Sequence, residues 1–102
     1  MAPHNPAQHP KIAADALSRM VQDVRSGRAE WAHPHTVRQA VDDLTRLSDA
    51  MATAVQQMTA ALTQLGHGSQ PHQRQSAAAL HMAGQAATTA ATQLRLARRG
   101  MH

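Results

Sequence analysis

An apolar line with alternating spacings of three and four residues runs through the middle of the chain and constrains the fold more than any other feature. Between Thr36 and Leu65 the line is broken once, at Ser48. Its apolar members are Val37, Val41, Leu44, Met51, Val55, Met58, Leu62 and Leu65. Such a repeat over about four heptads is typical of a long helix packed lengthwise on another helix. We therefore expect a helix over residues 36–65 with a helical neighbour.

Start and stop signals predict where this helix ends and where its neighbour begins. Thr36 and Gln39 have the spacing of a capping box at the start, and Gly66 can supply the left-handed residue at the end. The segment 66–71 contains two glycines, Ser69 and Pro71, which is a clear turn followed by a new helix start. Because this loop is short, we expect the next helix, 71–99, to run antiparallel to the first.

The third helix is predicted to offer mostly methyl groups to its neighbour. Its best heptad line is Leu80, Ala83, Ala87, Ala90, Leu94 and Ala97. We expect this line to pack against Met51, Val55, Met58 and Leu62 of the preceding helix. The other positions are largely Gln, Thr and Ala rather than Glu and Lys, which a solvated helix usually carries. We therefore expect a second subunit or another protein to cover part of this helix.

The first part of the chain is predicted to contain an arm and a shorter helix. Residues 1–10 hold three prolines and no apolar period, which favours a flexible arm. Residues 11–26 carry apolar side chains along one side and end at Gly27. Trp31 follows in a connector, either as a plug between helices or as an exposed anchor for a partner. The expected fold is an all-α three-helix bundle, with residues 11–100 as one domain.

Composition indicates that such a bundle would be marginally stable alone. The chain has 102 residues, one aromatic residue and no cysteine, so the core must come from Leu, Val, Met and especially Ala. Burial stabilises by about 25 cal/mol per Å² of apolar surface, and alanine has little surface to bury. We therefore expect a homo-oligomer or a complex with a protein partner.

Charge is distributed unevenly along the chain. After Asp49 no acidic residue occurs, so the net charge of +4 comes from the second half. One pole of the predicted bundle would gather Arg25, Arg28, Arg38, Arg95, Arg98 and Arg99. These arginines could contact phosphates of a nucleic acid, or they could serve solubility and the negative end of a helix dipole. No aromatic residues interleave with them for stacking on bases.

The residues that carry catalysis and metal binding do not form a recognisable pattern. Eight histidines are present, but none has the spacing that places two imidazoles on one helix face. No serine lies in a nucleophile motif, and no glycine-rich phosphate loop follows a strand. The amino terminus lacks a secretory pattern, and no run is long enough to span a membrane. We expect no cofactor, no metal and a cytoplasmic location, and the preference for Arg over Lys suggests a bacterial genome rich in GC.

The predicted function is that of a non-enzymatic, alanine-rich interaction module. It would act as a self-associating scaffold or adaptor through the surface of its third helix. The alternative is an accessory DNA-binding protein that contacts phosphates through the arginine pole.

Overall fold

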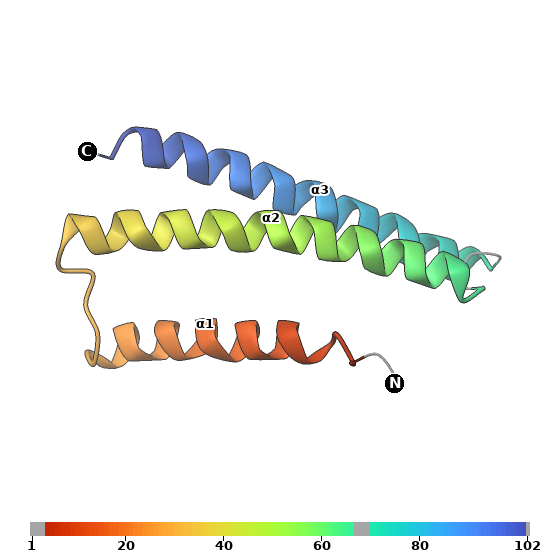
Figure 1. Ribbon diagram of the computed structural model, residues 1–102, viewed down its shortest axis with the longest axis horizontal. Helices are drawn as coiled ribbons and strands as arrows, with labels where there is room; N and C mark the ends of the chain where they lie inside the picture. The colour runs from red at the N-terminus through yellow and green to blue at the C-terminus, as the bar shows by residue number, and fades with distance from the viewer. Residues whose placement is uncertain (1–3, 67–69, 102) are drawn as a thin grey trace. The chain divides into compact units, whose positions relative to one another are not determined.

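The computed structural model describes residues 4–66 and 70–101, and their regular structure consists of helices with no strand. The helices are α1 (Gln8–Ser26), α2 (Pro34–Gln64) and α3 (Pro71–Arg99). The chain divides into two compact units, one ending at Pro34 and the other beginning at His35. The all-α class and the long hairpin are therefore confirmed (Figure 1). Docking of α1 on the hairpin stays a prediction.

The first unit contains α1, which begins three residues before the predicted start. Asn5 Oδ1 accepts a hydrogen bond of 3.0 Å from the amide of Ala7, and the helix starts at the next residue. Pro10 is tolerated because the first turn has no helical partner for its missing N–H. Gly27 ends the helix with φ 83°, and its amide donates to the carbonyl of Val24. The predicted arm, residues 1–10, is therefore partly helical.

α1 has no buried residue. Its less exposed side chains, Ala13, Leu17, Met20 and Val24, recur at spacings of four, three and four. Trp31, in the connector that follows, keeps 45% of its surface exposed. Its role as a plug or as an anchor stays a prediction.

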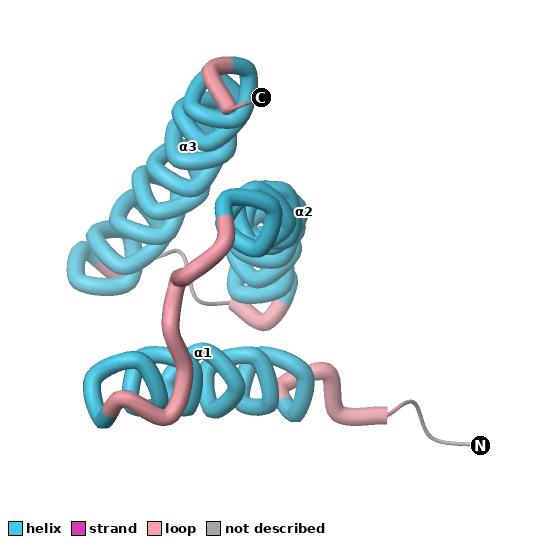
Figure 2. The backbone as a smooth tube through the Cα atoms, turned by 90° about the vertical axis from the view of Figure 1, so that its left-hand side faces the viewer, coloured by secondary structure: helices cyan, strands magenta, loops and turns pink. Residues whose placement is uncertain are grey.

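The second unit is the antiparallel hairpin of α2 and α3, which lie side by side in both views (Figures 1 and 2). α2 begins at Pro34, so Thr36 lies inside its first turn and is not the predicted cap. Proline favours this earlier start because its fixed φ suits the first helical position. Gly66 has φ 81°, which confirms the left-handed residue after α2. The rest of the predicted turn, residues 67–69, lies outside the described residues.

Small side chains form the seam between α2 and α3. On α2 the seam repeats as Val41, Thr45, Ser48, Ala52, Val55, Thr59 and Leu62. On α3 it repeats as Gln73, Ala77, Leu80, Gly84, Ala87, Ala91, Leu94 and Arg98. The most buried of these are alanine, glycine and threonine, and Ala91 has no exposed surface. The core of the hairpin therefore consists of backbone and methyl groups at close range.

This seam corrects half of the predicted packing. Met51 and Met58 are exposed, and Ala52 and Thr59, one residue further along α2, face α3 in their place. Likewise Ala83, Ala90 and Ala97 are exposed, whereas Gly84 and Ala91 are buried. The other predicted seam residues, Val55, Leu62, Leu80, Ala87 and Leu94, are buried or half-buried in it.

Close approach explains the choice of seam. A methyl group placed on Gly84 would lie 3.6 Å from Val55 Cγ1 and 3.8 Å from the carbonyl oxygen of Ala52. Bulky side chains at the positions of Thr45, Ala52 and Thr59 would hold the backbones further apart. Small residues let the two helices gain dispersion contacts along their whole length.

Candidate functional site

The hairpin has two unlike sides, and each is a candidate for function. One side carries Asp42, Asp49 and Gln56 of α2 beside His81, Thr88 and Arg95 of α3. We call it the polar side. In an antiparallel pair of helices, the residues that directly follow the contact positions of both helices lie on one side of the pair. The residues that directly precede those positions lie together on the other side. We call that opposite side the apolar side. It carries Leu44, Met51 and Met58 of α2, Leu65 directly after α2, and Ala83, Ala90 and Ala97 of α3.

Ion pairs join the helices on the polar side, near the open end of the hairpin. Arg95 pairs with Asp49, and Arg98 Nε donates to Asp42 Oδ1 at 3.0 Å. Arg98 also donates through a guanidinium nitrogen to the carbonyl of Met101 at 3.1 Å. Two of the three clustered arginines at the end of α3 are therefore engaged with groups of the same chain.

The remaining predicted phosphate-contacting arginines are divided between the two units. Arg99 lies beside Arg95 and Arg98, and all three line a shallow depression of about 420 Å³ on the polar side. Arg38 lies in the first turns of α2 and is half-buried. Arg25 and Arg28 are exposed and belong to the other unit, so a common pole of all six arginines stays a prediction.

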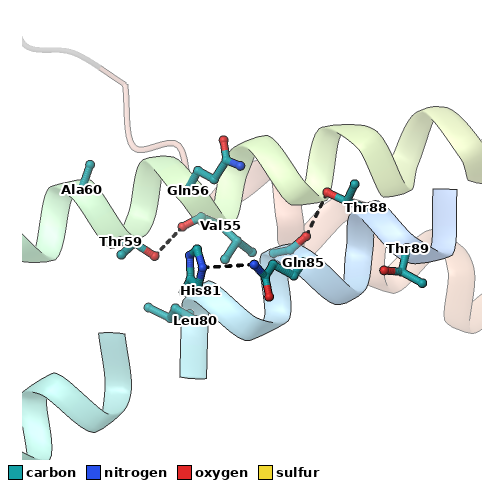
Figure 3. Close-up of a pocket in the computed structure, with 10 residues that line it drawn as sticks. Val55, Gln56, Thr59, Ala60, Leu80, His81, Gln85, Thr88 and Thr89 are labelled. Carbon is teal, nitrogen blue, oxygen red and sulfur yellow. Dashed lines mark hydrogen bonds between the residues drawn. The ribbon is translucent and has the colours of Figure 1, made fainter. Parts of the chain in front are cut away.

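A second depression, of about 640 Å³, lies further along the polar side toward the turn (Figure 3). Several of its polar groups bond to one another or to the backbone. Thr59 Oγ1 donates to the carbonyl of Val55 at 2.9 Å, and Thr88 Oγ1 donates to that of Gly84 at 3.2 Å. The ring nitrogen Nε2 of His81 lies 3.2 Å from Nε2 of Gln85.

The lining of this depression offers little chemistry. It contains no carboxylate, no lysine and no arginine, and its one titratable side chain is that of His81. Among the described residues, no group of three His, Asp or Glu side chains is placed to hold a metal ion.

The apolar side carries a second repeating line on α2. It consists of Val37, Ala40, Leu44, Leu47, Met51, Ala54, Met58, Ala61 and Leu65, with spacings of three and four throughout. Each of its residues from Ala40 to Ala61 directly precedes a seam residue, so this line lies about 100° around the helix from the seam with α3. Met51, Met58 and Leu65 are 50%, 47% and 72% exposed, whereas Leu44 and Leu47 are half-buried.

A matching line of small residues runs along the same side of α3. Its members, all exposed, are Ser76, Ala79, Ala83, Ala86, Ala90, Gln93 and Ala97. The predicted interface residues that left the seam, Met51, Met58, Ala83, Ala90 and Ala97, are thus brought together on this one side. Sequence reasoning missed that the predicted line combines residues from two separate lines on α2, the seam with α3 and this second line. The signal was the unbroken second line itself.

The wider context of the chain adds no further assignment. Comparisons with known protein families, with curated proteins and with solved structures found no match. Within the part of the chain that is described, no helix is both long and apolar enough to cross a membrane.

Proposed function

We propose that this protein is a non-enzymatic interaction module that self-associates, serving as a scaffold or adaptor. The observation that supports the proposal most is the absence of charge where apolar side chains are exposed. Residues 50–65 and 75–94, which we call the turn half of the hairpin, contain no Asp, Glu, Lys or Arg, whereas Arg74, close to the turn, lies outside these ranges. Exposed helix faces normally carry such residues.

Bulky apolar side chains are exposed within this uncharged region. Met51, Met58 and Leu65 lie along the apolar side, and Met82 is exposed on α3. Contiguous apolar surface of this kind marks interaction sites in soluble proteins. Methionine suits such a surface because its flexible thioether adapts to the shape of a partner. The small residues of α3, which we expected to form an interface, border this surface.

Energetics also favour association. The buried hydrophobic residues of the described chain are three alanines, Ala52, Ala87 and Ala91, and no large side chain is fully buried. Each large apolar side chain that passes from exposed to buried contributes about 1.5–3 kcal/mol. An interface over the apolar side would therefore supply stabilisation that the hairpin lacks.

The test is the mass of the full chain in solution, measured by light scattering after size exclusion. We expect a mass above the 10.9 kDa of one chain. Met58→Glu should return the protein to that mass, because it places a charge in the interface. Gln56→Glu is the matched control, since Gln56 is exposed on the same helix but lies on the polar side. A wild-type protein of 10.9 kDa at every concentration would refute the proposal.

Phosphate binding by the arginines is supported less well. Arg95 and Arg98 contact Asp49 and Asp42, so a phosphate would have to displace carboxylates from both. The polar side near these pairs carries charges of both signs rather than a positive surface.

A further inference from the structure

The apolar side differs between the two ends of the hairpin, and this difference bears on how copies would pack. The open end, residues 35–49 and 95–101, carries five arginines and three aspartates, which is a net charge of +2. The turn half carries none of these charges and holds the most exposed bulky residues, Met51, Met58 and Leu65. An interface centred on the turn half buries these residues and leaves the charges in solvent.

We propose that two copies pack through the apolar sides of their turn halves, with a two-fold axis crossing the helices near Met58. α2 of one copy then lies antiparallel against α2 of the other, and the open ends point in opposite directions. This inference rests on the proposed self-association and adds the surface, the occupant and the orientation.

Among partners outside this chain, charge favours a second copy as the occupant. A partner bearing charged side chains over this region would have to bury them against a surface that offers no counter-charge, which is costly. The partner surface must therefore be uncharged and apolar over the same length. A two-fold interface meets this condition, because both copies present the same patch.

The spacing of large and small residues fits the antiparallel orientation. With the axis at Met58, that residue meets its own equivalent, and Met51 lies opposite the position of Leu65 in the second copy. Ala54 then lies opposite the position of Ala61. Large layers alternate with small layers, as in antiparallel helical bundles whose side chains interdigitate. The small residues of α3 on the same side, Ala79, Ala83 and Ala86, allow the second hairpin to approach closely.

Orientation decides which charged ends meet. The alternative two-fold axis, parallel to the helices, places Met58 opposite Ala83 of the other copy and brings both open ends to one end of the dimer. Each open end carries a net charge of +2, so that arrangement is opposed by repulsion between like charges. The crossing axis separates the two ends.

Disulfide trapping separates these arrangements without background, because the chain has no cysteine. Met58→Cys, Ala83→Cys and Gln56→Cys are prepared singly, two of them with tags of different size, and oxidised at dilute concentration. We expect Met58→Cys to give a cross-linked dimer on a non-reducing gel. Gln56→Cys should give only the low level that arises from collision, because Gln56 lies on the polar side. A cross-link between Met58→Cys and Ala83→Cys that exceeds the one between two Met58→Cys chains would overturn the crossing axis.

Because Met58→Cys changes the centre of the proposed interface and could weaken the dimer, a second pair of variants tests the same arrangement at other positions. Mixed Met51→Cys and Leu65→Cys chains should form a mixed disulfide more readily than either forms with itself. If the reduced variants are dimers by light scattering and neither expected cross-link forms, the arrangement is wrong while self-association stands. If the wild type is a monomer by light scattering, the proposed function itself fails.

Discussion

Gly84→Ala tests the close approach of α2 and α3 directly. Gly84 is buried in the middle of α3, and its backbone faces Val55 and Ala52 across the seam. The added methyl group would meet Val55 Cγ1 at 3.6 Å and the Ala52 carbonyl oxygen at 3.8 Å. These are ordinary van der Waals separations, so the methyl group fits without moving either neighbour. We therefore expect the substitution to stabilise the hairpin.

Two effects set the size of the gain. Alanine is favoured over glycine inside a helix by about 1 kcal/mol. Burial of one more methyl group adds up to about 0.8 kcal/mol. The free energy of unfolding should rise by about 1–2 kcal/mol, which for a chain of this size raises the midpoint of thermal unfolding by roughly 5–10 °C.

The assay is thermal unfolding followed by circular dichroism, at matched protein concentration because association also affects the midpoint. Ala78→Gly is the control, since Ala78 is exposed on α3 off the apolar side and should lose only the helix preference of about 1 kcal/mol. The gain at Gly84 should exceed this loss. A lower midpoint for Gly84→Ala would mean that the helices are closer than described or that the seam runs along another line.

Two further substitutions probe the hairpin. Ala87→Leu should destabilise by about 1–3 kcal/mol because Ala87 is buried in the seam, whereas Ala90→Leu should change the hairpin by less than about 0.5 kcal/mol; equal effects in chemical denaturation would contradict the seam. Arg98→Ala should cost about 0.2–1 kcal/mol through loss of the pair with Asp42, and the cost should shrink as salt is added. Arg99→Ala, beside it, should cost less, and a loss for Arg98→Ala that salt does not change would argue against an electrostatic origin.

Element order and most helix ends, other than the starts of α1 and α2, could be predicted from the chain because local signals specify them. Pro71 at the start of α3 and Gly66 after α2 act within one turn of their own position. The earlier start of α1 at Gln8 was not predicted, because the hydrogen bond from the Ala7 amide to Asn5 is a local contact that the apolar period does not report.

The rotation of α2 against α3 was harder to predict because the predicted line and the observed seam share residues on α2. The shared residues are Val41, Ser48, Val55 and Leu62. The positions between them can be filled either by the bulky residues of the predicted line or by their small neighbours. Large side chains suggest a core, but this pair of helices gains more from approaching closely at Ala52 and Gly84. The same rotation brings Asp42 and Asp49 to Arg98 and Arg95, a pairing between distant residues that only the folded hairpin reveals.

The hydroxyl groups along α2 and α3 have a consequence for how the surface behaves. Each of those on Thr45, Thr59, Thr63, Ser76, Thr88 and Thr92 donates to the carbonyl four residues earlier in its own helix. A hydroxyl whose proton is already used in this way has no further donor to offer. Toward a neighbouring molecule, such a threonine resembles valine more than serine. The mean hydropathy of −0.46 therefore underestimates the apolar character of the surface that these two helices present to another chain.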